Sequence, residues 1–246
     1  MQDIITQFAD RYRLTATEVM VEIESALSAI LSKWYQLEVI VSFREDLLLE
    51  AVAYSNNRGV IRQDIVNITV MNESIIKLYL EKALEKAALF KQIRRYKAYE
   101  KELLWGEITT CDRERNLYVE TEIIPGEQIL AICPANRIGL HERYSRYFLP
   151  GQRRAFHLRR VEPVELNGTP RLKIVVDRVS KTLVETLMRN QIKSSENQLK
   201  ICCVKRYVGH KSLVLATSRL PKAAIVAVDR ELRERIQVEV VKTLPT

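Results

Sequence analysis

The spacing of hydrophobic and polar positions changes character near residue 105, from a helical repeat to a strand-like one. Before this point, apolar residues recur every three or four positions over 15–35 and again over 74–101, which is typical of amphipathic helices. After it, short segments alternate apolar and polar residues, as half-buried strands do. The pattern therefore predicts an α+β, multidomain chain with boundaries at 1–103, 104–179 and 180–246.

The first 103 residues are expected to form a helix-rich α+β domain. A short helix is predicted over 1–14, and Thr15-Ala-Thr-Glu18 reads as a capping box that begins a second helix. We expect the stripe of this second helix, which ends at Trp34, to lie in the core. Strands are predicted over 37–43 and 47–54, with a turn at 55–59 and a further strand within 60–70. The longest helix then covers about 74–101.

The middle segment predicts a five-stranded β-barrel of the OB type. Its strands are expected at 107–111, 116–123, 128–132, 154–161 and 172–176, with the turn Asn167-Gly-Thr-Pro170 before the last. Barrels of this kind commonly bind single-stranded nucleic acid on their open face. Phe156 is the aromatic residue that we expect to be buried, and Tyr118 the one that we expect to be exposed or half-exposed. The alternative is a barrel that only packs, since a fold does not settle a function.

The last 67 residues predict a small α/β unit. Helices are expected at 180–192 and 221–235, and strands at 199–207, 212–216 and 236–241, in the order α-β-β-α-β. This segment is also the basic part of the chain. It holds 13 Lys and Arg against 6 Asp and Glu, whereas the whole chain carries +8. Such a surface attracts phosphate backbones, although it can also serve solubility alone.

Composition argues against a membrane protein and against disulfides. No apolar run approaches the roughly 18 residues that span a bilayer, and the chain begins Met-Gln-Asp without an apolar leader. We therefore expect a cytoplasmic protein. The four cysteines have no C-x-x-C spacing and no histidine at zinc spacing, so reduced thiols without a metal are expected.

The sequence lacks the common catalytic signatures. It has no P-loop, no G-x-G-x-x-G, no G-x-S-x-G and no H-E-x-x-H, and its seven glycines leave little material for a phosphate cradle. Its three histidines have no serine or cysteine nearby in a triad-like context. We expect no enzymatic activity and no cofactor.

Arginines interleaved with aromatic residues make the barrel and the basic segment candidate RNA-binding surfaces. Aromatic rings stack on bases, and Arg pairs with phosphate or stacks on bases. The candidates in the barrel are Arg113, Arg115, Tyr118, Arg143, Tyr144, Arg154, Arg159 and Arg160. Those in the last segment are Lys205, Arg206, Lys211, Arg219 and Lys222.

The end of the longest helix is a candidate docking surface for an acidic partner or for RNA. It gathers Lys91, Arg94, Arg95, Lys97 and Lys101 beside Tyr96 and Tyr99. Cations near a helix C-terminus also suit the helix dipole, so a purely local role is the alternative.

The order of these parts resembles the NusA family of bacterial transcription elongation factors, in shortened form. The resemblance is most specific at Ala131-Ile-Cys-Pro134, His141-Glu-Arg-Tyr144 and Leu149-Pro-Gly-Gln152, which are similar to the family's Ala-Ile-Leu-Pro, Gly-Glu-Arg-Tyr and Pro-Gly-Asp. It extends to Arg62-Gln-Asp-Ile-Val-Asn-Ile-Thr-Val70 and to the barrel exit Val176-Asp-Arg-Val-Ser180. Family members have a polymerase-binding domain, a barrel of the ribosomal-protein S-one type and KH domains.

The last segment departs from that family. The Gly-x-x-Gly loop with which a KH domain clamps the nucleic-acid backbone is missing, because Lys-Ala-Ala-Ile-Val-Ala-Val follows Pro221. One helix and a second KH domain are also missing. This unit therefore resembles a degenerate KH domain, in which lysine and arginine contact phosphate by charge alone.

The resemblance implies an accessory protein of a bacterial-type RNA polymerase. Residues 1–103, through the cations from Lys91 to Lys101, would dock on the core enzyme near the β flap and the RNA exit channel. The barrel and basic segment would hold single-stranded nascent RNA and so modulate pausing, termination or antitermination, and we expect a monomer. Two alternatives stay open: a polymerase-independent RNA-binding protein of translation or RNA decay, and a protein–protein adaptor.

Overall fold

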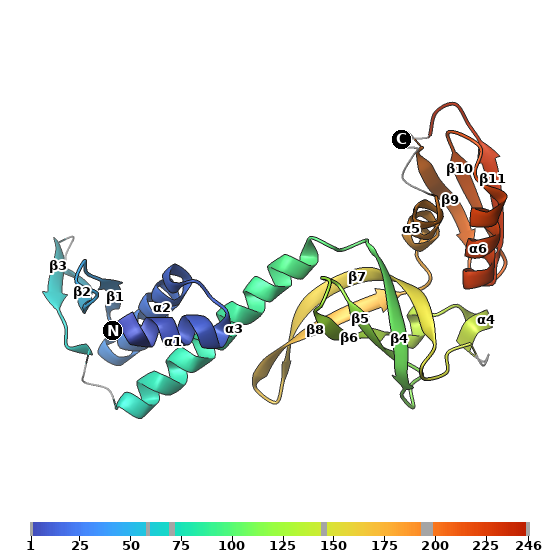
Figure 1. Ribbon diagram of the computed structural model, residues 1–246. Coiled ribbons are helices and arrows are strands. Elements are labelled where there is room, and N and C mark those ends of the chain that lie inside the picture. The colour runs from blue at the N-terminus through green and yellow to red at the C-terminus, as the bar shows by residue number, and fades with distance from the viewer. Residues whose placement is uncertain (1, 58–59, 69–71, 144–146, 193–198, 245–246) are drawn as a thin grey trace. The chain divides into compact units, whose positions relative to one another are not determined.

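A computed structural model describes residues 2–57, 60–68, 72–143, 147–192 and 199–244. It confirms an α+β chain with three separate sheets, one in each of the three segments predicted above. The chain forms two compact units, residues 1–92 with 165–171, and residues 93–164 with 172–246. The helices and strands are labelled in Figure 1.

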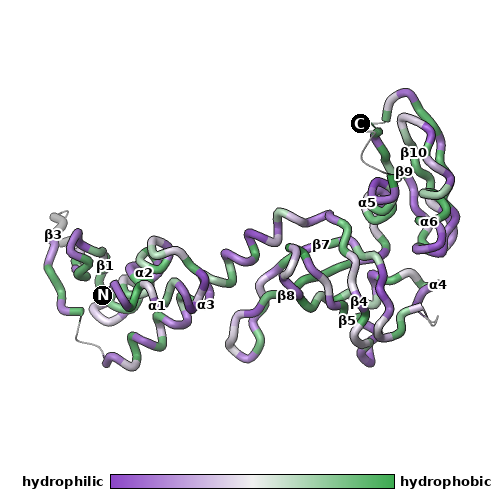
Figure 2. The backbone as a smooth tube through the Cα atoms, viewed as in Figure 1, coloured by the Kyte–Doolittle hydropathy of each residue, from purple (hydrophilic) through white to green (hydrophobic). Residues whose placement is uncertain are grey.

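The first unit places helices against one antiparallel sheet. Its elements are α1 (Gln2–Tyr12), α2 (Ala16–Tyr35), β1 (Glu38–Phe43), β2 (Leu49–Asn57), β3 (Val60–Ile65) and α3 (Glu73–Lys97), with sheet order β1-β2-β3. Hydrophobic residues of α2 and α3, among them Val19, Leu27 and Leu84, meet Val39 and Ala51 of the sheet in one core. The colouring of Figure 2 shows the apolar stretches that supply these faces.

Helix α2 begins at the predicted capping box. Thr15 Oγ accepts the Glu18 N–H at 3.2 Å, and Glu18 Oε2 accepts the Thr15 N–H at 2.8 Å. The same helix protects the free edge of β1. Ser32 Oγ and Ser28 Oγ accept the N–H groups of Val39 and Val41, each at 2.8 Å. These contacts satisfy donors that an open sheet edge would otherwise present to other chains.

Three predictions in this unit are wrong in detail. The turn placed at 55–59 is shorter, because β2 continues to Asn57, which pairs with Val60. The long helix ends at Lys97 rather than 101. Trp34 is not in the core but is 55% exposed, since the stripe of α2 is wider than the face that the sheet and α3 cover.

The second unit contains a closed five-stranded barrel. Its strands are β4 (Leu103–Cys111), β5 (Leu117–Glu122), β6 (Gln128–Cys133), β7 (Arg153–Leu166) and β8 (Thr169–Asp177), hydrogen-bonded in the order β4-β5-β6-β8-β7. All five predicted strands are present, although β4, β7 and β8 are longer than predicted. A 3₁₀ turn (Ala135–Arg137) and the short helix α4 (Leu140–Arg143) lie between β6 and β7.

The barrel wall is buried on both sides in the middle of β7. Phe156 is 1% exposed, as predicted, and Tyr118 is half-buried. The alternation expected for β7 fails at Ala155 and His157, which are also buried. Ala155 belongs to the hydrophobic core of the C-terminal segment, together with Leu183 and Leu187. The C-terminal segment therefore packs on the outside of the barrel.

That segment forms a lobe of two helices and a mixed sheet. Its elements are α5 (Lys181–Gln191), β9 (Ile201–Tyr207), β10 (Lys211–Ala216), α6 (Lys222–Leu232) and β11 (Arg235–Val240), in the predicted order. Strand β10 is central, antiparallel to β9 and parallel to β11. Ser180 caps α5 by accepting the Leu183 N–H at 3.2 Å. Leu183, Leu187 and Met188 lie in the hydrophobic core of this lobe.

Candidate nucleic-acid interface

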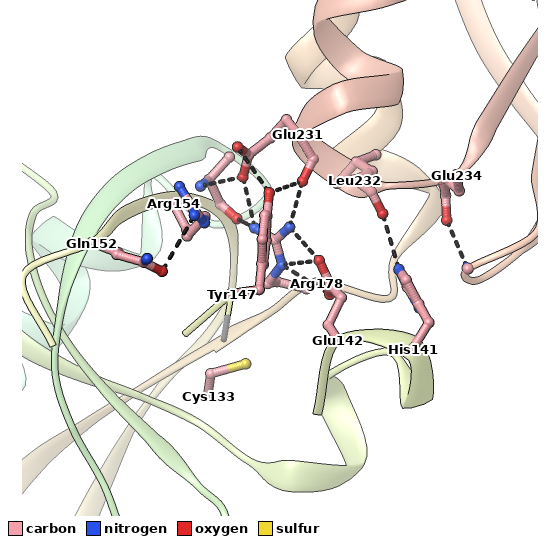
Figure 3. A network of polar contacts seen from close by, with 12 residues as sticks. Cys133, His141, Glu142, Tyr147, Gln152, Arg154, Arg178, Glu231, Leu232 and Glu234 are labelled. Atoms are coloured by element: carbon pink, nitrogen blue, oxygen red, sulfur yellow. Dashed lines mark hydrogen bonds and ion pairs between the residues drawn. The ribbon is translucent and has the colours of Figure 1, made fainter. Parts of the chain in front are cut away.

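Arg178, directly after β8, joins the barrel to the C-terminal lobe. Its side chain is fully buried, and Nη1 donates to Ala155 O at 2.6 Å and to Glu231 Oε1 at 2.9 Å (Figure 3). Nη2 donates to Glu142 Oε1 at 2.6 Å and to Glu231 O at 3.0 Å. Burial alone would lower the pKa of Arg178, but the carboxylates of Glu142 and Glu231 raise it above its usual value. The guanidinium therefore stays charged and ties α4, β7 and α6 together.

Aromatic rings surround this guanidinium. It lies 5.4–5.6 Å from the ring centroids of Tyr147, Phe148 and Phe156. The Tyr147 hydroxyl donates to the backbone carbonyl of Glu231, and burial raises the pKa of Tyr147 to about 12. Tyr147 thus helps to close the interface between barrel and lobe.

A second set of contacts joins α4 to the lobe. His141 Nε2 lies 3.0 Å from the carbonyl oxygen of Leu232. The ring also packs on Gly209, where φ is +77° and a Cβ would collide with the imidazole. Next to it, Glu234 accepts the Gly209 N–H at 3.1 Å and the Ser212 hydroxyl at 2.8 Å. Any larger residue at 209 would push the lobe away from His141.

The predicted barrel residues fall into two groups, of which the first surrounds the β4–β5 loop. Arg113 and Arg115 are exposed there, and half-buried Tyr118 follows on the outer face of β5. The loop is fixed by Asp112, whose carboxylate accepts the Asn116 N–H at 2.9 Å. Hydrogen bonds from Asn116 hold the pKa of Asp112 below its usual value. The structure thus brings two cations and a ring to one end of the barrel.

The second group lies on β7 and α4. Arg154 stacks on Tyr147, with its guanidinium carbon 3.9 Å from the ring centroid. This contact places Arg154 at the barrel–lobe interface. Arg159 is 3.6 Å from Asp177, and Arg160 pairs with Glu162 at 3.0 Å. Arg143 Nε donates to the carbonyl of Ile138 at 3.1 Å. Tyr144, the remaining candidate, lies outside the described residues.

In the lobe, four of the five predicted cations are surface residues and one is not. Those on the surface are Lys205, Lys211, Arg219 and Lys222. The prediction that Arg206 is an RNA-binding surface residue is wrong. Its side chain is 3% exposed, and its Nε donates to the buried Glu234 carboxylate at 2.8 Å. The strand alternation around 205–206 is broken by a β-bulge, which explains the error.

The predicted polymerase-binding cations are spread over the end of α3 and the chain after it. Lys91 Nζ is 2.6 Å from Glu18 Oε2, and Arg95 is 2.9 Å from Glu127. Arg94, Lys97 and Lys101 are exposed. Two of these five side chains are therefore paired inside the chain, and three face solvent.

A groove in the first unit was missed by the sequence analysis. It encloses about 710 Å³ between α2 and α3, with small side chains such as Ala26 and Ala83 in its lining. Trp34 and Tyr79, which are 55% and 48% exposed, also line it. Its charged lining residues are all cations: Lys33, Lys82 and Lys86. The sequence feature that could have revealed this groove is the wide apolar stripe on α2, which was assigned entirely to the core.

The described part of the chain holds no cluster of three His, Cys, Asp or Glu side chains that could bind a metal. Within that part, no helix has the length and apolar character needed to cross a membrane. Neither a scan against models of protein families nor a search among curated proteins finds a match for this sequence.

Proposed function

We propose that the chain is a NusA-like accessory factor of a bacterial-type RNA polymerase. In this proposal residues 1–103 bind the polymerase near the RNA exit channel, and the barrel and lobe contact the nascent transcript. The observation that carries the proposal is the strand order β4-β5-β6-β8-β7 of the barrel, joined through Arg178 to a mixed three-stranded sheet.

The barrel supports an OB-type assignment. OB folds are five-stranded closed or partly open barrels whose second and third strands, with the loops between strands 1 and 2 and between strands 4 and 5, bind oligonucleotides. In this chain the first of those loops is the β4–β5 loop. Arg113 and Arg115 lie on it, beside Tyr118 on the second strand. Charge and a stacking ring thus occur together where an OB fold binds a single strand.

The lobe supports a KH-like assignment without a backbone clamp. Its α-β-β-α-β order and mixed sheet fit that fold with one helix fewer, and Thr217 to Pro221 connect β10 to α6 without a glycine. RNA would be held by the net charge of +7 between 180 and 246, from 13 cations and 6 anions. Binding of this kind weakens steeply with salt, because each contacted phosphate releases counterions.

The α2–α3 groove supports docking on a protein. Exposed Trp34 and Tyr79 beside small residues provide an apolar surface into which a helix can pack, and Lys33, Lys82 and Lys86 favour acidic flanks on that helix. We therefore propose this groove as a second polymerase contact, separate from Arg94, Lys97 and Lys101.

The experiment is co-migration with core RNA polymerase on size-exclusion chromatography at moderate salt. The proposal expects a complex that the Trp34→Ala variant forms less well. Absence of a complex would contradict it. If residues 1–92 can be deleted without loss of RNA binding or of cellular function, the polymerase-independent alternative is favoured.

A further inference from the structure

The outer surface of β4 and β5 carries a pocket of about 460 Å³, a size within the range of ligand sites. Half-buried Trp105 forms part of its wall, while another part of its side chain packs against the hydrophobic core of the C-terminal lobe. Three carboxylates line it, from Glu107, Glu120 and Glu122, and Arg153 is the one cation among the lining residues. The pocket is therefore acidic on a chain whose net charge is +8.

The positions of two of these carboxylates disfavour folding of the sheet. Glu107 on β4 lies directly opposite Glu120 on β5, and like charges in this relation destabilise a sheet. Arg153 lies opposite Glu107 on the other side. Yet, within the part of the chain that the structure describes, neither Glu107 nor Glu120 forms an ion pair within 4.0 Å or a side-chain hydrogen bond. The pocket thus gathers three carboxylates and one guanidinium beside an aromatic ring, an excess of negative charge.

Two ligand classes do not fit this pocket. The described carboxylates form no group close enough to hold a metal ion. RNA is disfavoured because its phosphates are repelled by the same three side chains. A larger organic cation fits better, since an arginine guanidinium can stack on an indole face and pair with carboxylates at once.

We propose that this pocket binds a basic segment of a partner protein, with an arginine or lysine side chain on Trp105 between Glu107 and Glu120. The proposal does not rest on RNA or polymerase binding. It gives the barrel two surfaces of opposite charge, a basic one at Arg113 and Arg115 for nucleic acid and an acidic one for protein.

The test uses the full chain with Trp34→Phe, so that Trp105 is the one remaining tryptophan. An oligoarginine peptide is titrated while Trp105 fluorescence is recorded. We expect saturable quenching, weakened about tenfold or more by the double change Glu107→Gln and Glu120→Gln. The matched control, Glu38→Gln with Glu239→Gln, makes the same charge change at exposed strand positions outside the pocket and should leave the affinity unchanged.

Folding does not confound this test. Removal of like charges that face each other should leave the thermal midpoint of the double variant equal to or above that of the parent. The proposal is overturned if the pocket variant binds the peptide as tightly as the parent, or if the control variant weakens binding equally. Spermine that binds as tightly as the peptide, with the same dependence on Glu107 and Glu120, would identify a polyamine site and overturn the protein partner.

Discussion

Arg178 and Glu142 form a buried ion pair, with Nη2 2.6 Å from Oε1 and the two side chains 0% and 2% exposed. Arg178 follows the last barrel strand and Glu142 lies on α4, and the same guanidinium also donates to Glu231 at the end of α6. A charge removed from water in this way is tolerated only when every partner is present. The Arg178–Glu142 pair holds α4 to the end of the last barrel strand, and the bonds from the same guanidinium to Glu231 join the barrel to the lobe.

Loss of the arginine should destabilise that unit severely. Arg178→Met leaves the Glu142 carboxylate buried without its partner, which costs about 3–5 kcal/mol. The free energy of unfolding in urea measures this. The double change Arg178→Met with Glu142→Leu should recover part of the loss, because the more deeply buried of the two carboxylate partners is then removed while Glu231, 14% exposed, stays without its arginine. A single variant as stable as the parent would show that the network is not what joins barrel and lobe.

Lys205 and Arg206 are neighbours in sequence with opposite expected roles. Lys205 is exposed on β9, so Lys205→Ala should reduce the slope of log affinity for single-stranded RNA against log salt by about one, with unchanged stability. Arg206→Ala removes the partner of buried Glu234 and should instead lower stability. Filter binding over a salt series, with urea unfolding, measures both. Equal RNA defects without a stability change would contradict this assignment.

The capping box predicts a pH dependence for the first unit. The hydrogen bond from Lys91, followed by the backbone N–H of Thr15, lowers the pKa of Glu18 from 4.5 to about 2. Because the folded pKa is depressed, this stabilisation is complete above about pH 4.5 and is lost as the pH falls towards 2.

The matched variants are Glu18→Gln and Glu22→Gln. At neutral pH the first should cost about 0.5 kcal/mol, as exposed ion pairs typically do. Its difference from the parent should shrink as the pH falls from 4.5 and disappear below about pH 2, where Glu18 itself becomes protonated. Unfolding followed by fluorescence in a Trp105→Phe background, where Trp34 on α2 is the reporter, measures this. A difference that is independent of pH, or equal for Glu22→Gln, would contradict the assignment.

The groove between α2 and α3 predicts a binding defect without a folding defect. Trp34 is 55% exposed, so Trp34→Ala should change stability by less than about 0.5 kcal/mol while it weakens polymerase binding. Val21→Ala on the same helix is the control, because Val21 is 54% exposed but does not line the groove. Surface-immobilised polymerase measures both affinities. Equal binding by the two variants would exclude the groove as the docking surface.

Local patterns predicted the elements well because local physics determines them. The capping box at Thr15, the alternation of β5 and the apolar face of α5 each need only nearby residues. The errors arise where distant segments meet. Trp34 was placed in the core because a stripe does not reveal how much of it a partner covers. Ala155 is buried because the lobe covers this part of β7, and His157 is buried beside Asp177 at the end of β8.

The residue types of the candidate site could be predicted from the sequence, but the contacts that each residue makes could not. Arg113 and Tyr118 were correctly assigned to one loop and the strand that follows it, because only five positions of chain separate them. The bonds of Arg178 connect residues 36 and 53 positions away, and no local pattern identifies such partners. The same holds for Arg206, whose carboxylate partner lies 28 positions further along the chain.

The most direct test of the account compares two elongation complexes, one with a transcript still enclosed by the polymerase and one with a transcript that has emerged. The affinity of the full chain for each is measured by gel shift over a salt series. We predict binding to both, about tenfold tighter to the complex with emerged RNA and with a steeper salt dependence for that complex. Equal affinity and equal salt dependence for the two complexes, or no binding to either, would contradict the account.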